Sequence, residues 1–169
     1  MQQPNKDEYA AYYQTYVEKV PEGNIIKILK KQTNEVKKLF KNVSKKKSLF
    51  RYSPEKWSVR EVLGHIIDTE RIFAYRALRF ARSEQKDLPA FDENEYIRQS
   101  NYHVIKLANL VDEFCALRKS NLLMLKNFSD EMWLRKGTAN NNSFTVRAMA
   151  YIMAGHVNHH LNVLREKYL

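Results

Sequence analysis

The amino-acid sequence predicts an all-α protein, a four-helix bundle preceded by a short N-terminal helix. Four long segments repeat apolar residues at the three- and four-residue intervals of an amphipathic helix, and no segment convincingly alternates as a strand does. The 169 residues include only four glycines and four prolines, so long helices can run without interruption. This length suits one domain with a sizeable core, and we expect residues 1–169 to form one.

A tyrosine-rich stripe predicts the short N-terminal helix. Its members lie at helical spacing: Tyr9, Tyr12, Tyr13, Tyr16 and Val17. A segment this short is not stable alone, so it must pack on the bundle or on a second subunit. Residues 21–23 then interrupt the pattern, and the first long helix is expected from about Asn24 to Val43.

The second long helix has the sharpest predicted start. Ser58 and Glu61 form a capping box, in which each side chain accepts a hydrogen bond from the backbone amide of the other residue. Trp57 and Val62 flank the cap as a hydrophobic staple. The apolar pattern continues to about Arg82.

A long connection separates the second and third long helices. It runs from Arg82 to His103, and residues 92–95 in it are typical of the start of a short helix. A connection of this length can cross the bundle, so the helices on either side need not be antiparallel. The third long helix follows, from about residue 107 to 128. Residues 137–143 are expected as a polar loop, before a last helix from Ser143 or Thr145 to about Tyr168.

Two histidines lie four residues apart on the apolar face of the last helix. His156 and His160 share this face, whereas His159 lies toward its edge. One buried histidine is more often a hydrogen-bonded core residue than a metal ligand. Two on one stripe leave several ring nitrogens that need partners, and a divalent metal would bind one nitrogen of each. His65, at the flank of the second helix's stripe, could add a third ligand and leave coordination positions open for water or substrate.

Two acidic residues follow His65 on the same predicted helix, Asp68 and Glu70. Glu70 lies inside the apolar stripe, where we favour a buried ion pair with an arginine such as Arg76 or Arg79. Asp68 and Glu70 stay candidates for orienting a metal ligand or accepting a proton. His103 has no periodic partner and is assigned no role.

The composition excludes several classes of protein. No apolar run approaches the ~18 residues of a membrane span, and residues 1–7 lack an apolar signal-peptide segment. Cys115 is the only cysteine, so no internal disulfide forms, and its apolar surroundings predict a small core residue. We therefore expect a cytoplasmic protein that does not enter a membrane.

The net charge is +10, from 29 basic and 19 acidic residues. The basic excess clusters in Lys27, Lys30, Lys31, Lys37, Lys38, Lys41, Lys45, Lys46 and Lys47. This cluster indicates either a nucleic-acid patch or a solvated lysine face followed by a flexible turn. We favour the solvated face, because no arginine or aromatic pattern of a nucleic-acid reader accompanies it.

Two motifs together resemble the DinB-like superfamily: KWSVREVLGHIIDTE at residues 56–70 and GHVNHH at residues 155–160. Members of that family are up-down-down-up four-helix bundles that bind a divalent metal through three histidines. The resemblance therefore implies this topology and the ligands His65, His156 and His160. It also implies metal-dependent hydrolysis, or thiol S-transfer with bacillithiol or mycothiol. Since members are often dimers, we expect a homodimer.

The favoured function is a metal-dependent enzyme that acts on a small molecule. Hydrolysis needs a proton acceptor beside a metal that lowers the pKa of water toward ~7. Thiol transfer needs cations that hold an acidic thiol cofactor, for which Arg60, Arg76 and Arg147 are candidates. Three nitrogen ligands suit zinc, nickel, iron or manganese. The alternatives are a noncatalytic module whose lysine face binds nucleic acid or another acidic partner, and a bundle with structural histidines.

Overall fold

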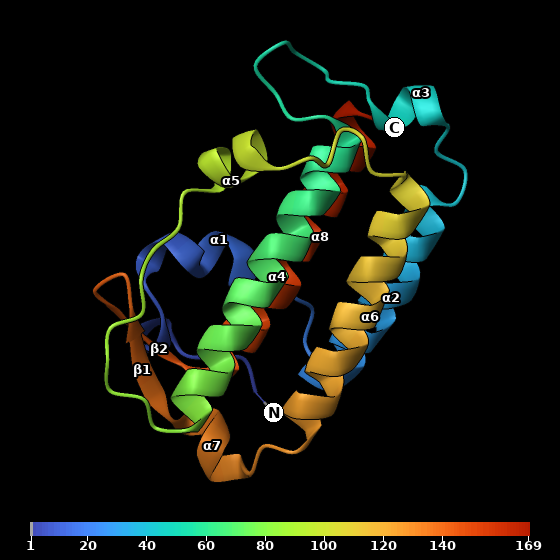
Figure 1. Ribbon diagram of the computed structural model, residues 1–169. Coiled ribbons are helices and arrows are strands. Elements are labelled where there is room, and N and C mark those ends of the chain that lie inside the picture. The colour runs from blue at the N-terminus through green and yellow to red at the C-terminus, as the bar shows by residue number, and fades with distance from the viewer. Residues whose placement is uncertain (1) are drawn as a thin grey trace.

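Four long helices dominate the computed structural model, which describes residues 2–169 (Figure 1). They are α2 (Ile25–Phe40), α4 (Val59–Ala81), α6 (Leu107–Lys126) and α8 (Val146–Lys167). In Figure 1, α2 and α8 run toward the top of the view, whereas α4 and α6 run toward the bottom. The predicted all-α, up-down-down-up four-helix bundle is therefore confirmed.

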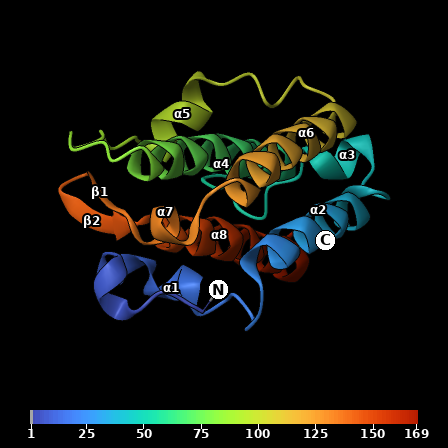
Figure 2. The same ribbon diagram turned by 90° about the horizontal axis from the view of Figure 1, so that it is seen from below.

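The parallel helices α4 and α6 are joined by the long crossover that the sequence predicts. It contains α5 (Glu93–Gln99), which begins where expected because the Asp92 carboxylate accepts hydrogen bonds from the amides of Asn94 (2.9 Å) and Glu95 (3.0 Å). In both views α5 lies on the outside of α4 (Figures 1 and 2). The crossover thus covers one side of α4, the helix that carries His65.

Several short elements depart from the expectations drawn from the sequence. The tyrosine segment is not one helix but two 3-10 turns and one α turn: Lys6–Glu8, Ala11–Tyr13 and α1 (Gln14–Val17). Two further helices, α3 (Lys45–Ser48) and α7 (Asp130–Leu134), form where none is expected. Each begins at a serine, Ser44 or Ser129, whose Oγ accepts an amide hydrogen bond from the first turn.

The expected polar loop before the last helix is instead a β-hairpin. Strands β1 (Lys136–Ala139) and β2 (Asn142–Thr145) pair antiparallel. Asn140 and Asn141 form the turn with φ of 51° and 59°, a left-handed conformation that asparagine tolerates better than most residues. The expectation of no strand is wrong because four-residue strands are too short to show a clear alternation.

The N-terminal segment packs along α8, on the side away from the bundle axis (Figure 2). The Glu8 carboxylate accepts hydrogen bonds from Thr145 Oγ1 at 2.8 Å and from the Arg147 guanidinium. Farther along, the Tyr16 carbonyl lies so close to Gly155 that a Cβ there would overlap it. The tyrosine stripe therefore packs on its own bundle, although the Tyr12 side chain stays 69% exposed.

Glu70 forms a buried ion pair, as the sequence predicts, but with a different arginine. Its carboxylate accepts two hydrogen bonds from Arg118, from Nε at 2.6 Å and from Nη2 at 2.8 Å. The expected partners, Arg76 and Arg79, instead contact Pro89 and Glu84. The reason is that Arg118 approaches from α6, and a single-helix pattern does not reveal which neighbouring helix faces a given residue.

The Arg118 guanidinium extends into a polar network that joins all four long helices. Its Nη1 donates to the Gln32 Oε1 of α2 at 2.9 Å. The Gln32 side chain in turn donates to the Ala154 carbonyl of α8 at 2.7 Å. Because both charged side chains are fully hydrogen-bonded, the pair fixes how the helices pack rather than leaving an uncompensated charge.

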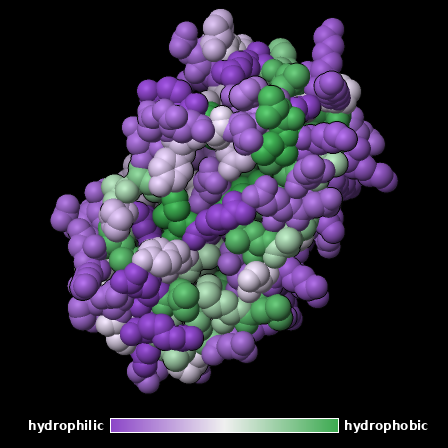
Figure 3. Space-filling view, in the orientation of Figure 1, coloured by the Kyte–Doolittle hydropathy of each residue, from purple (hydrophilic) through white to green (hydrophobic). Residues whose placement is uncertain are grey.

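The surface facing the viewer in Figure 3 is largely hydrophilic, and apolar residues interrupt it in separate patches. None of the helices in residues 2–169 is long and apolar enough to span a membrane. Cys115, expected in the core, lies only partly buried on α6. Most of the lysine cluster is exposed along α2 and α3, as both the solvated face and the nucleic-acid patch require.

Candidate metal centre

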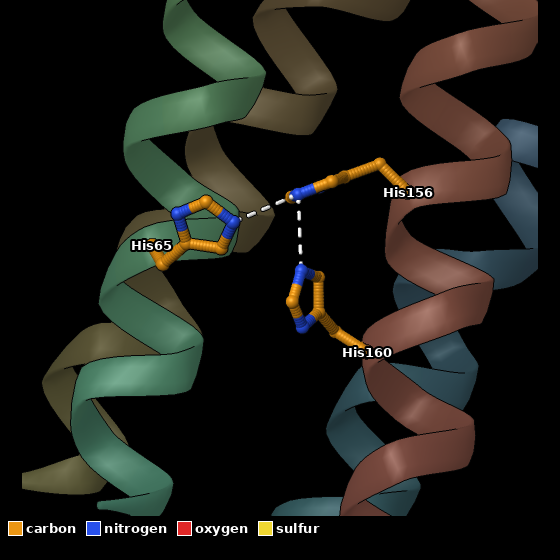
Figure 4. A group of neighbouring side chains, drawn as sticks. All are labelled: His65, His156 and His160. Carbon is orange, nitrogen blue, oxygen red and sulfur yellow. Dashed lines mark hydrogen bonds between the residues drawn. The ribbon is translucent and has the colours of Figure 1, made fainter. Parts of the chain in front are cut away.

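The structure brings His65, His156 and His160 together between α4 and α8 (Figure 4). The Nε2 atom of His156 lies 2.9 Å from Nε2 of His65 and 3.1 Å from Nε2 of His160. The four-residue spacing places two of the rings one turn apart on α8. Since α8 packs against the antiparallel α4, the third ring meets them from the facing helix.

His65 lies at the groove between helices, as its flank position predicts, but it is buried. Only 7% of the residue is exposed, because the half-buried Trp57 ring packs against the imidazole with 4.8 Å between ring centroids. The Thr69 hydroxyl, one turn farther along α4, lies 3.5 Å from Nδ1 of His65. These two neighbours hold the ring so that its Nε2 points toward His156.

Burial keeps the three imidazoles neutral at physiological pH. Loss of hydration lowers the pKa of His65 to about 4. The same cause lowers the pKa of His156 and of His160 well below the ordinary value, and repulsion between neighbouring histidines lowers both further. Neutral imidazole is the form that binds a metal.

The arrangement of the three nitrogens fits a shared cation better than hydrogen bonds among the rings. Each neutral Nε2 carries either one hydrogen or one lone pair, so the His156 nitrogen cannot form a good hydrogen bond to both neighbours. Two nitrogens bound to one cation at roughly 2.0–2.1 Å would lie about 3.3–3.4 Å apart at a tetrahedral angle and about 2.8–3.0 Å apart at an octahedral angle. The His156 Nε2 lies 2.9 and 3.1 Å from the other two Nε2 atoms, near these values, and the three ligand atoms all lie within 4.8 Å of one another.

The histidines border a pocket of about 590 Å³. Five stretches of the chain enclose it: the N-terminal segment, α4, the middle of the crossover, the β-hairpin and, through His156, α8. His65 and His156 are among the lining residues, whereas His160 is not. A pocket of this volume is large enough for a small-molecule ligand.

The remaining acidic and histidine candidates lie outside the cluster. Asp68 accepts a hydrogen bond from the Tyr102 hydroxyl at 2.7 Å, and Glu70 belongs to the core ion pair. Neither carboxylate hydrogen-bonds to a cluster histidine in the described part of the chain. His159 packs against Tyr16, as its edge position predicts, and His103 is exposed in the crossover.

Of the three arginines considered for a thiol cofactor, only Arg76 lines the pocket. Arg60 donates to Ser48 Oγ at 2.8 Å and to the His103 carbonyl at 2.9 Å, so it ties α3 and the crossover to α4. Arg147 is engaged by the Glu8 carboxylate. Two of the three guanidinium groups therefore serve the fold rather than the pocket.

For several pocket residues, the sequence does not show that they line a pocket. Tyr13 and Tyr16 are part of the N-terminal stripe, but the stripe does not reveal that it faces the histidines. Glu93 belongs to the predicted helix start in the crossover, and Asn142 to the expected loop. Thr69 could be inferred, because a residue four positions after a helical histidine lies on the same face.

Comparison with known proteins gives two findings. A family model described as the DinB superfamily matches residues 28–164. The solved structure of YfiT from Bacillus subtilis, described as a probable metal-dependent hydrolase with an unusual four-helix bundle topology, is similar with a TM-score of 0.74 and 14% sequence identity. The similarity covers 96% of this chain and 89% of that one, and at this identity it shows the fold alone. The comparison with curated proteins gives no significant match.

Proposed function

The chain belongs to the DinB superfamily, and from this premise we propose that it is a metal-dependent hydrolase of a small molecule. His65, His156 and His160 are the proposed ligands of one divalent cation. The observation that carries the proposal is the convergence of three neutral imidazole nitrogens at the wall of a pocket. A divalent cation held there would polarise a substrate oxygen and activate a water for attack at neutral pH.

The pocket also supplies groups that can handle protons. Glu93 is the carboxylate among its lining residues, and we assign it to accept the proton that hydrolysis releases. Burial raises the pKa of the Tyr13 and Tyr16 hydroxyls, so both stay protonated and can donate hydrogen bonds to substrate oxygens. The Tyr16 ring, 5.5 Å from the His156 ring between centroids, also limits the access of water to that histidine.

The composition of the pocket favours hydrolysis over thiol transfer. A low-molecular-weight thiol cofactor with several acidic groups needs several cations, and the pocket contains a single arginine and no lysine among its lining residues. A substrate with fewer charges fits it better. Zinc, nickel, iron and manganese are all compatible with three nitrogen ligands, and the pocket does not select among them.

The proposal is tested by assaying ester and amide hydrolysis, alongside transfer of candidate thiols to small electrophiles. Chelation should abolish turnover, and re-addition of one metal should restore it. His156→Ala should be inactive, whereas the neighbouring His159→Ala should retain activity and serve as the matched control. Full activity in chelated protein would show that the reaction does not use a metal, and turnover of thiols alone would replace hydrolysis by transfer.

A further inference from the structure

Arg76 is a buried cation without a carboxylate partner in residues 2–169. The residue is 3% exposed, yet it forms no ion pair there, whereas Arg118 pairs with Glu70 and Arg147 with Glu8. Its hydrogen-bond partners are neutral: Nη2 donates to the Pro89 carbonyl at 2.7 Å, and the guanidinium also interacts with the Tyr13 hydroxyl. The Asp87 carboxylate attracts it electrostatically but forms no ion pair with it. A buried cation is costly unless an anion or several hydrogen bonds compensate it.

The guanidinium has donors left for a ligand. It carries five N–H groups, which exceed the contacts described above. Among the described residues, every fully buried side-chain nitrogen or oxygen has a hydrogen-bond partner. Any Arg76 nitrogen without a protein partner is therefore not fully buried, and the side chain to which it belongs lines the pocket. Arg60 also lacks a carboxylate partner, but it does not line the pocket.

The position of Arg76 along α4 relates it to the metal centre. Eleven residues separate it from His65, which places both side chains within about 20° of one another on the helix surface. At 1.5 Å per residue the two positions are roughly 16 Å apart along the axis. Thr69 and Phe73 lie between them and also line the pocket. One continuous wall thus connects the cation to the histidines.

Most of the other lining residues are aromatic rings or alanines, and the polar groups of Thr69, Glu93, Asn140 and Asn142 lie among them. Its aromatic lining residues are Tyr12, Tyr13, Tyr16, Phe73, Phe91 and Phe144. Such rings bind flat apolar groups well. The three tyrosines precede the range that the family model matches, residues 28–164, so this part of the wall comes from outside the matched segment.

We propose that the pocket binds an elongated small molecule with an aromatic or similarly flat apolar body and one oxyanion group, and that Arg76 binds the oxyanion. The reacting bond then lies at the histidine end of the wall. This proposal names the substrate class of the proposed hydrolase and rests on that function. Carboxylate and phosphate share the chemistry that a guanidinium recognises, two oxygens that accept parallel hydrogen bonds.

The test measures the affinity of three probes by calorimetry: naphthoate, the neutral naphthamide and naphthyl phosphate. Wild-type protein should bind at least one anionic probe about tenfold or more tightly than naphthamide. Comparison of naphthoate with naphthyl phosphate identifies the preferred oxyanion. Equal affinity for all three probes would overturn the proposal without any variant.

Each measurement is made on metal-loaded and on chelated protein, because an anion can also bind a metal directly. The preference for the anionic probe should persist after chelation if Arg76 provides it. A preference that disappears on chelation would assign the anion to the metal instead and would overturn the role of Arg76.

Variants locate the binding group. Arg76→Met should reduce the preference for the anionic probe to within about twofold, and Arg76→Lys should retain part of it, since lysine keeps the charge but not the two-pronged donor. Arg82→Met is the matched control. This substitution removes the same charge near the same end of α4, but Arg82 is exposed and does not line the pocket. An unchanged preference in Arg76→Met would contradict the proposal.

The outcome is separable from that of the proposed hydrolase. Circular dichroism and metal content establish that each variant folds and retains its metal centre. If Arg76→Met does not fold, Arg76→Lys and the probe comparison in wild type still decide the matter. A protein that binds no metal but prefers the anionic probe would reject the proposed hydrolase alone. A protein that binds metal but shows no preference for the anionic probe would reject the substrate class alone.

Discussion

Buried imidazoles make the stability of the metal-free protein depend on pH. The ordinary histidine pKa is 6.5, whereas that of folded His65 is about 4. Between these values the unfolded chain binds more protons than the folded one, so acidification favours unfolding. The contribution is fully present above pH 6.5 and is lost as the pH falls toward 4.

We therefore predict that metal-free protein loses stability from pH 6.5 to pH 4, with His65 contributing on the order of 3 kcal/mol. Denaturant titrations across this range measure the effect. His65→Gln, which cannot titrate, should show a shallower loss, while His103→Gln in the exposed crossover should follow wild type. Parallel curves for wild type and His65→Gln would contradict the assigned pKa.

The buried ion pair gives a second prediction for single residues. Arg118→Met leaves the Glu70 carboxylate buried without its partner and should lower the free energy of unfolding by about 3–5 kcal/mol. Arg71→Met removes a surface partner of Glu113 and should cost at most about 1 kcal/mol. Chemical denaturation of the two variants compares them, and equal costs would mean that the buried pair does not organise the core.

For single residues, the sequence predicts which face of its helix a residue occupies, but not which residue of another helix it contacts. The spacing of His156 and His160 is sufficient to place them together, because both belong to one helix. The partner of Glu70 is wrongly predicted, since Arg118 is 48 positions away on another helix. The flank position of His65 makes it a candidate third ligand, and the family resemblance adds the implication that it binds the same metal as the other two.

Among the elements, the long helices are predicted well where their ends carry caps. The capping box of Ser58 and Glu61 is present, with the Ser58 amide donating to the Glu61 carboxylate at 2.6 Å, and α4 begins at Val59 as expected. The β-hairpin and α7 are not predicted. Elements of four or five residues contain too few positions to establish a period.

The docking of the N-terminal segment on α8 depends on Gly155. An added Cβ would overlap the Tyr16 carbonyl, and backbone atoms cannot move aside as a flexible side chain can. We predict that Gly155→Ala releases residues 11–17 and speeds their amide hydrogen exchange, while the bundle stays protected.

Gly64→Ala is the control for this prediction, because it makes the same change in α4 but crowds the Tyr102 ring instead. Exchange in residues 11–17 should then remain as in wild type. Unchanged exchange in Gly155→Ala would mean that the segment is held by its other contacts, chiefly that of Glu8 with Arg147.

For the whole molecule, the sequence predicts the topology better than the pocket. The length of the crossover allows α4 and α6 to be parallel, and they are parallel in the structure (Figure 1). The pocket is assembled from five separate stretches, and the pattern of each one alone does not show which others it will meet. The homodimer stays a prediction, and since most of the tyrosine stripe packs on its own chain, light scattering must decide it independently.

The lysine face is predicted to be irrelevant to turnover. Lys45, Lys46 and Lys47 do not line the pocket, and exposed charges are screened over ~8 Å at physiological salt. Replacing all three by glutamine should leave turnover within about twofold. Salt-dependent binding of nucleic acid that is lost in this variant, without any metal-dependent turnover of small molecules, would favour the noncatalytic alternative.

Metal content tests the central claim most directly. Elemental analysis of untagged protein should find about one divalent metal per chain in wild type and in His159→Ala, because three converging imidazoles form a single site. The double variant His156→Ala, His160→Ala should contain almost none, since one imidazole is too weak a ligand set. Full occupancy in the double variant would contradict the assignment of His65, His156 and His160 as the metal centre.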